Sequence, residues 1–280
     1  MPNIHIQDLT KTYKSIHKSQ ALVGCSLLID KPGIYSIVGP NGAGKTTLLK
    51  IIAGILRKTS GIVSVQGSTF YVPENPASYD NLSASEHFDL VERCVDSSEI
   101  IRTPKEVLDL VGLPHKKKIF DYSKGMKRRL NIGMSLIAKR EIMLLDEPFE
   151  GLDPSISEEI STDLKKLDDG SRIIILSSHD LARVEDLSDV IIFLKAGSIM
   201  LNIETKSADS IVIKVPGGTE VTNFLEKLHA NYDISEDEII INVEKEKSQD
   251  IIKKLVMQGI SINEMKTPSL LETYRKVMEK

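Results

Sequence analysis

The stretch G-P-N-G-A-G-K-T at residues 39–46 constrains the fold of this chain more than any other feature. It fits the pattern G-x-x-x-x-G-K-[S/T] without a mismatch. An apolar, β-branched run at 34–38 precedes it. The run after it repeats apolar residues at helical spacing, namely Leu48, Leu49, Ile52, Ile55 and Leu56. A strand before and a helix after favour an anion-binding loop over a glycine-rich turn that only links two elements.

Each residue type in this loop has a physical role in binding phosphate. Gly39, Gly42 and Gly44 allow backbone conformations and close approaches that a Cβ atom would obstruct. The exposed amides then point into one concavity at the positive end of the helix dipole. Lys45 supplies a positive charge to the outer phosphates, and the hydroxyl of Thr46 can ligate Mg²⁺.

Short apolar runs elsewhere predict an α/β fold with a mostly parallel sheet. The runs at 34–38, 142–145, 172–176 and 190–194 contain no charge in their interior, which is typical of strands buried on both faces. Helical patterns separate them, as in a parallel sheet. The polar, helix-rich stretch at about 75–138 is expected to form a helical subdomain inserted into this core.

We expect a large domain at residues 1–205 and a small α+β domain at 206–280. The predicted elements of the small domain are a strand at 211–215, a helix reaching 228, a strand at 238–243, a further helix, a strand at 260–263 and a final helix from 269. No internal repeat is evident, so a solenoid is not expected.

Several element ends carry local signals. Thr103 offers an N-cap, Pro104 suits the first helical position and Glu106 can close a capping box. Another helix should start after Asp153, and residues 196–197 should form a tight hairpin turn.

Composition excludes several classes of protein. The formal net charge of −4 argues against a surface that works mainly by gripping nucleic acid. Cys25 and Cys94 are the only cysteines, so neither a disulfide framework nor a C-x-x-C metal site is predicted, and a reducing cytoplasm is expected. No apolar run approaches the ~20 residues needed to cross a bilayer, and the first residues lack a signal-peptide core. Any link to a membrane is therefore expected to pass through another polypeptide.

Two acidic residues follow the predicted strand at 142–145. A carboxylate at the C-terminal edge of a strand, beside a phosphate loop, is placed to hold Mg²⁺ through water, and Asp146 is predicted to do so. Glu147 points to the other face of the chain, where it could orient an attacking water. A surface acid before a proline is common by itself, but the strand and the phosphate loop favour the functional interpretation.

With these pieces joined, the sequence resembles the ATP-binding subunit of ABC transporters over residues 3–203. The matching positions are Tyr13 for the aromatic that stacks on adenine; Gly39, Pro40, Asn41, Gly42, Ala43, Gly44, Lys45, Thr46 and Thr47 for Walker A; 142–147 for Walker B; Ser123, Lys124, Gly125 and Met126 for the signature; 151–153 for the D-loop; and His179 for the switch histidine.

The resemblance implies a P-loop NTPase fold of the RecA-like type. Its mostly parallel sheet would carry an antiparallel β part, an inserted helical subdomain and the small C-terminal appendage. It implies ATP and Mg²⁺ as cofactors, with Thr46, Glu74 and Asp146 near the metal. Glu147 would be the catalytic glutamate, and His179 would contact the γ-phosphate and sense its loss.

The signature serine and glycine stand at the head of a predicted basic helix, an arrangement that resembles a second anion site. In the family this surface, here 123–125, closes the nucleotide held by another subunit, so two chains enclose two ATP molecules head to tail. The resemblance therefore implies a homo- or heterodimer. It also implies a transmembrane permease as partner, contacted around residues 74–95, with the chain held in the cytoplasm on the inner face of the cell membrane.

The sequence departs from the family pattern at three positions. Glu74 stands where a glutamine is expected, so it adds negative charge near the phosphates and removes an amide donor. Lys124 replaces a signature glycine, and it either adds a cation facing the γ-phosphate or is solvated. Met126 replaces a polar residue. Such a signature, with a C-terminal extension like 206–280, is similar to that of exporter-type subunits.

The sequence thus predicts an ATPase that powers a membrane transporter, with export favoured. A soluble ABC-type ATPase acting in macromolecular assembly stays open as an alternative, because its core would look alike. A GTPase is disfavoured because the chain lacks the tetrapeptide N-K-x-D. A DNA-repair member of the superfamily is disfavoured because the insertion is too short for a long coiled coil. A paired-domain member is disfavoured because the sequence has one phosphate loop and not two.

Overall fold

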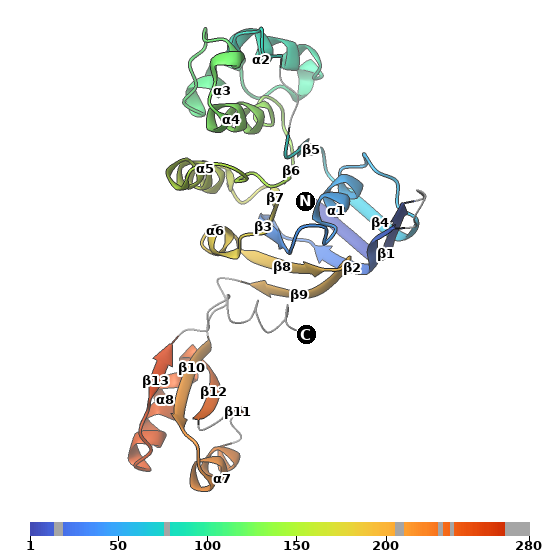
Figure 1. The fold of residues 1–280 in the computed structure, drawn as a ribbon. Coiled ribbons are helices and arrows are strands. Elements are labelled where there is room, and N and C mark those ends of the chain that lie inside the picture. The colour runs from blue at the N-terminus through green and yellow to red at the C-terminus, as the bar shows by residue number, and fades with distance from the viewer. Residues whose placement is uncertain (14–18, 76–78, 205–209, 229–231, 236–237, 267–280) are drawn as a thin grey trace. The chain divides into compact units, whose positions relative to one another are not determined.

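The computed structural model describes residues 1–13, 19–75, 79–204, 210–228, 232–235 and 238–266 (Figure 1). Contacts between residues divide the chain into two compact units, Met1–Ile203 and Glu204–Lys280. None of the described helices is long and apolar enough to cross a membrane.

The first unit is built on a six-stranded sheet whose strand order is β5-β6-β7-β3-β8-β9. In that order the strands are Thr69–Val72, Ile142–Leu145, Ile173–Ser178, Gly33–Val38, Val190–Lys195 and Ser198–Glu204. Neighbours from β5 to β8 pair in parallel, and every residue of β3, β6 and β7 is buried. The predicted α/β class and the four predicted strands are confirmed, because continuous apolar runs suit a sheet that is covered on both faces.

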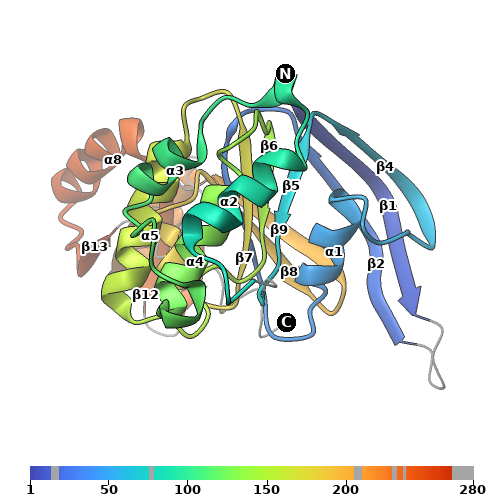
Figure 2. The same ribbon diagram turned by 90° about the horizontal axis from the view of Figure 1, so that it is seen from above.

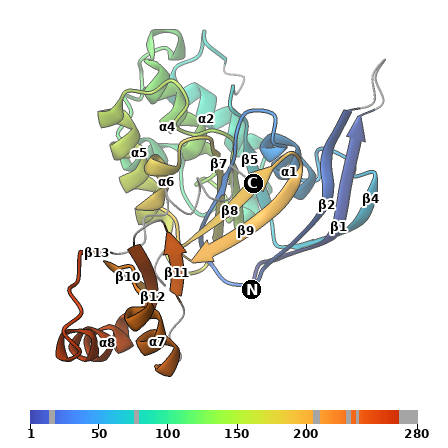
Figure 3. The same ribbon diagram turned by 60° about the horizontal axis from the view of Figure 1, so that its bottom comes forward.

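The predicted hairpin at 196–197 joins β8 to β9 (Figure 3). Ala196 and Gly197 have φ angles of 46° and 81°, which is the backbone pattern of a tight two-residue turn. The amide of Gly197 donates to the carbonyl oxygen of Ala43 at 2.9 Å. The hairpin is therefore hydrogen-bonded to the phosphate loop and helps to hold it in place.

A second, antiparallel sheet has the order β2-β1-β4, with strands Ser19–Ile29, Asn3–Tyr13 and Ser60–Gln66. This sheet and helix α1, Lys45–Ile52, lie on one side of the six-stranded sheet and α5 lies on the other (Figure 2), as does α6 (Figure 3). Alternate residues of the six strands, such as Ile37, Leu144 and Ile175, share one core cluster with α1 and the antiparallel sheet. The antiparallel part implied by the resemblance is confirmed.

Helix α1 ends earlier than its apolar pattern predicts. The last helical residue is Ile52, and Gly54 follows with a φ of 72°. The amide of Gly54 bonds to the carbonyl of Ile51, and that of Ile55 to the carbonyl of Lys50, which together close a Schellman motif. Ile55 is therefore 62 % exposed, and the predicted apolar stripe is wrong at this residue, whereas Leu56 packs against the core cluster although it lies beyond the helix.

Three helices follow β5: α2, Ala84–Arg93; α3, Pro104–Leu110; and α4, Lys124–Met134. They share their own apolar cluster, which includes Phe88, Leu108 and Leu130. The predicted capping box at Thr103 and Glu106 is confirmed. Two further helices pack on the sheet, α5 at Pro154–Leu167 and α6 at Leu181–Glu185.

In its described residues, the second unit has an antiparallel sheet of order β11-β12-β10-β13 and two helices. Its elements are β10 Ser210–Pro216, α7 Thr219–Lys227, β11 Tyr232–Ser235, β12 Glu238–Glu244, α8 Lys245–Met257 and β13 Glu264–Lys266. The predicted strand at 260–263 is wrong, because the ladder with β10 begins only at Glu264, opposite Lys214. Ile260 and Ile262 instead pack against the apolar cluster, which explains their pattern. The final helix predicted from Ser269 lies outside the described residues.

His87 on α2 is a buried titratable group of the helical layer. Its side chain is 3 % exposed, and neither ring nitrogen has a hydrogen-bond partner among the described residues. The ring lies against Tyr79 and Phe88, with centroid distances of 5.8 and 6.5 Å. Burial lowers the pKa of His87 below its ordinary value, because the charged form loses solvation.

We expect the free energy of unfolding to fall as the pH drops from 7.5 to 5.5, and to fall less in His87→Met. The folded-state pKa of His87 lies below the unfolded value of about 6.5, so protons bind the unfolded chain better and acid destabilises the fold. One such group changes the free energy by at most about 1.4 kcal/mol per pH unit. Urea unfolding at the two pH values measures the effect, with the exposed His5→Gln as control. Equal pH dependence in wild type and His87→Met would contradict it.

Candidate functional site

The loop at 39–44 joins β3 to α1, and close contacts with neighbouring backbone require glycine at two of its positions. A Cβ atom on Gly39 would lie 2.0 Å from the carbonyl oxygen of Leu194, and one on Gly44 would lie 2.5 Å from that of Ala21. Gly44 also has a φ of 107°. The loop is therefore wedged between β2 and β8, and only glycine allows this approach.

Lys45 at the start of α1 is 6 % exposed, and its ammonium group is fully engaged. Its Nζ atom donates to the carbonyl oxygens of Gly39 at 2.8 Å and Pro40 at 3.3 Å, and lies 3.1 Å from Oε1 of Glu147. A buried ammonium needs such partners, since its desolvation is costly. The side chain of Lys45 thus extends over the loop toward Glu147. A phosphate oxygen bound at the loop could replace these acceptors.

Asp146, 1 % exposed at the end of β6, accepts three hydrogen bonds. The hydroxyl of Thr46 lies 3.0 Å and that of Ser177 2.7 Å from Oδ1, and the hydroxyl of Tyr71 lies 2.9 Å from Oδ2. The pKa of Tyr71 is raised, first by burial and then by the charge of Asp146. A hydroxyl beside a carboxylate is an oxygen donor pair of the kind that Mg²⁺ prefers, so these residues fit the metal.

Glu147 adopts a φ of 43°, which is rare for a residue with a side chain. Two contacts hold its backbone there: its amide donates to Oγ of Ser177 at 2.8 Å, and its carbonyl oxygen accepts from Arg128 at 3.1 Å. Strain of this kind is found where surrounding contacts fix a functional group. As a result, the carboxylate turns out of the strand toward Lys45 and His179.

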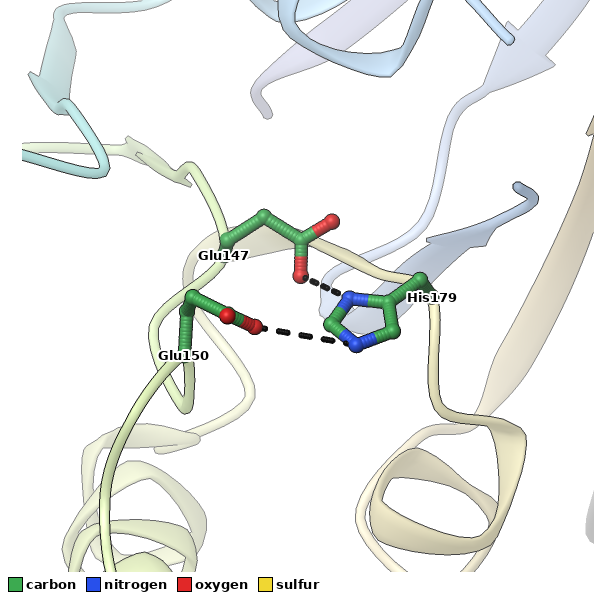
Figure 4. Close-up of side chains that lie close together, drawn as sticks. All are labelled: Glu147, Glu150 and His179. Atoms are coloured by element: carbon green, nitrogen blue, oxygen red, sulfur yellow. Dashed lines mark hydrogen bonds and ion pairs between the residues drawn. The ribbon is translucent and has the colours of Figure 1, made fainter. Parts of the chain in front are cut away.

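The imidazole of His179 lies between two carboxylates, as Figure 4 shows. Its Nδ1 atom is 3.1 Å from Oε2 of Glu147, and its Nε2 atom is 3.6 Å from Oε2 of Glu150. His179 stands directly after β7 and is 43 % exposed, while Glu147 is 12 % exposed. An imidazole in this position can donate a hydrogen bond to an incoming phosphate while it orients the Glu147 carboxylate.

A hollow of about 280 Å³ opens beside the phosphate loop. Its lining comprises Ala21, the loop residues 41–47, Glu74 and Glu147. The exposed side chain of Glu74 therefore lies beside the loop, and its contact with a metal stays a prediction. The size and the ring of amides suit a polyphosphate group.

Arg128 is a site residue that sequence reasoning missed. From inside α4, its guanidinium group donates to the carbonyl oxygens of Pro73 at 3.1 Å, Glu74 at 2.9 Å and Glu147 at 3.1 Å. Burial lowers its pKa, and the carboxylates of the site oppose that shift. Arg128 ties the helical layer to the strand ends that carry the acids. Its place in the basic run 127–129 was visible, but nothing in the sequence singled it out.

Tyr13, at the end of β1, lies near the loop but does not line the hollow described above. Its hydroxyl is 3.3 Å from that of Thr47, and the ammonium group of Lys11 lies 5.0 Å from the centre of its ring. The ring is 39 % exposed, so one face remains available for stacking. Its contact with adenine stays a prediction.

The signature residues are not gathered at the loop within one chain, since none of them lines the hollow. Ser123 caps α4 by accepting from the amide of Met126 at 3.2 Å. A Cβ atom on Gly125 would lie 2.6 Å from Ile156 of α5, and one on Gly151 would lie 2.1 Å from Nζ of Lys124. The side chain of Lys124 thus rests against the D-loop of its own chain.

Ser177→Ala is expected to lower the free energy of unfolding by about 1–3 kcal/mol, because it leaves the amide of Glu147 without an acceptor and removes a donor from Asp146. Urea unfolding followed by circular dichroism measures the loss. Ser161→Ala on α5, which removes only a bond to a helix carbonyl, is the matched control and should change the value by less than about 0.5 kcal/mol. Equal effects of the two substitutions would show that the Ser177 bridge is not stabilising.

Comparisons with known proteins agree with this geometry. The family model described as ABC transporter matches residues 22–150. The lantibiotic transport ATP-binding protein SrtF of Streptococcus pyogenes is 35% identical over 219 residues, which cover 74% of this chain and 93% of SrtF. The ABC transporter ATP-binding protein YcbN of Bacillus subtilis is 31% identical over 295 residues, which cover 97% of this chain and 95% of YcbN.

Solved structures show the same fold. The ATP-binding cassette MJ0796, in a dimeric state bound to ADP and phosphate, superposes with a TM-score of 0.65 at 24% identity, over 72% of this chain and 98% of that one. The solved structure of an ATP-binding subunit of an ABC transporter superposes with a TM-score of 0.63 at 25% identity, over 73% of this chain and 91% of that one. The phosphate loop, the acidic strand end and these relatives agree, and the chain belongs to the ATP-binding subunits of ABC transporters.

Proposed function

We propose that this ATPase subunit hydrolyses ATP with the groups gathered between the phosphate loop and β7, and powers export through a separate membrane permease. The observation that carries the proposal is the position of Glu147, whose carboxylate lies between the ammonium of Lys45 and the imidazole of His179. A carboxylate beside an ammonium group and an imidazole is placed to accept a proton from a water that attacks the γ-phosphate.

The loop residues have separate tasks in this proposal. The amides of 41–46 cradle the β- and γ-phosphates, and Lys45 exchanges Glu147 for a phosphate oxygen when the nucleotide enters. Thr46 and Asp146 would hold Mg²⁺, which supplies charge neutralisation at the phosphates when bound. The entry of the nucleotide frees the Glu147 carboxylate for water.

His179 and Tyr13 complete the site of one chain. The Nε2 edge of His179 faces Glu150 and is exposed enough to reach a γ-phosphate. Glu150 then keeps the ring oriented. Tyr13 offers its free face to the adenine ring, with its hydroxyl held at Thr47.

A second subunit is proposed to supply the signature of each site. Ser123, Lys124 and Gly125 do not reach their own phosphate loop, which supports their action on the nucleotide of a partner chain. Cassettes of this family dimerise, as the dimeric state of MJ0796 exemplifies. Whether the pair is a homodimer or a heterodimer depends on the permease complex.

Export and the location of the chain are also proposals. Among the relatives, SrtF is named for lantibiotic transport, and LnrL of Bacillus subtilis, 33% identical over 210 residues, is named for linearmycin resistance. The permease would dock around 74–95, where the side chains of Tyr79 and Leu90 are 66 % and 40 % exposed. The chain would then sit on the cytoplasmic face of the cell membrane, reaching it only through the permease, with 206–280 as a separate small domain.

Glu147→Gln is expected to reduce steady-state ATP turnover of the complex by about 100-fold or more, because the amide cannot accept the proton. The variant should still bind ATP and should accumulate as a dimer in Mg-ATP, seen by light scattering after gel filtration. Glu158→Gln on the exposed face of α5 is the matched control and should keep normal turnover. Near-normal turnover of Glu147→Gln would remove Glu147 from the mechanism, and a strictly monomeric variant would remove the shared site.

A further inference from the structure

A cavity of about 150 Å³ lies between α3, α4 and α5, and shares no lining residue with the hollow at the phosphate loop. Its walls are apolar. Val111, Ile132, Leu136 and Ile160 are each at most 6 % exposed, and Leu110 and Leu167 stand nearer the surface. Apolar cavities of this volume in other proteins take up benzene, so the space suits about six carbon atoms.

Charged side chains surround this apolar space, and cations predominate among them. Arg102, Arg129 and Lys166 line the cavity, against one carboxylate, that of Asp163. Asp163 is shared, because its Oδ1 lies 3.4 Å from Nζ of Lys166 and its Oδ2 lies 3.9 Å from Nε of Arg129. Arg129 also pairs with Glu159. Among the charged residues that line the cavity, three are cations and one is an acid.

Arg129 adds an independent sign that an acceptor is missing. Its Nε atom is buried and has no hydrogen-bond partner among the described residues. Buried donors are nearly always paired, since an unpaired one costs free energy. The 3.9 Å between Nε and Oδ2 of Asp163 is too long for a hydrogen bond, so this donor lacks an acceptor among the described residues.

We propose that this cavity binds a small amphipathic carboxylate, with an apolar body of about six carbons inside and the carboxylate at Arg102, Arg129 and Lys166. A short-chain fatty acid and an aromatic acid share this chemistry. The ligand would bridge α4, which begins at the signature, and α5, which follows the D-loop. The inference stands on the cavity and its charges and does not depend on the proposed function.

The test uses the full chain and hexanoate or benzoate as the probe, with saturation-transfer NMR and calorimetry. Both carboxylates should bind at least about fivefold more tightly than hexan-1-ol, benzyl alcohol, hexylamine or benzylamine, because only the anions gain charge-assisted hydrogen bonds at the rim. The ratio of hexanoate to benzoate affinity tells an alkyl from an aromatic preference. Alcohols or amines that bind as well as the acids would overturn the proposal, as would the absence of binding by both acids.

Two variants locate the site. Lys166→Glu should weaken carboxylate binding about fivefold or more, while its neighbour Lys165→Glu, which lines a different surface hollow on α5, should leave it unchanged. Val111→Phe should fill the space and abolish binding while the thermal midpoint stays level or rises, which shows that the variant is folded. Equal effects of the two lysine variants, or undiminished binding by a folded Val111→Phe, would contradict the assignment.

Discussion

The buried ion pair between Lys45 and Glu147 is the interaction on which the rest of the site depends. Lys45 follows β3 and Glu147 follows β6, and β7 stands between these strands in the sheet. Parallel strands end at the same edge, so residues about 100 positions apart in the chain meet within 3.1 Å. With the ammonium desolvated, an anion must always face it. In this structure the Glu147 carboxylate is that anion, and in the proposed mechanism a phosphate oxygen takes its place.

Around that pair, polar groups are shared so that few are left without partners. Ser177 serves both acids, since its hydroxyl donates to Asp146 and accepts from the amide of Glu147. Arg128 gathers three carbonyl oxygens from two strand ends and joins them to α4. One guanidinium group thus links α4 to the backbone of Glu147.

The sheet and the loop were predictable, because their signals are local. An uninterrupted apolar run such as 142–145 is typical of a strand that is buried on both faces. The glycine pattern at 39–44 reflects steric limits that act within a few residues. Predictions failed where a non-local or conformational term decided the outcome. Gly54 ended α1 although apolar spacing continued, and Ile260 proved to be a packing residue instead of a ladder residue.

By itself, the sequence determined the α/β class, the phosphate loop, both acids after β6 and the histidine after β7, because each motif lies within one strand-to-loop junction. Only the tertiary structure decided which of these groups touch. Tyr71, Ser177 and Arg128 carry no motif, and they join the site solely because separate strand ends and a helix converge on it. Hydrogen bonds and ion pairs act over about 3–4 Å, and sequence distance does not report such proximity.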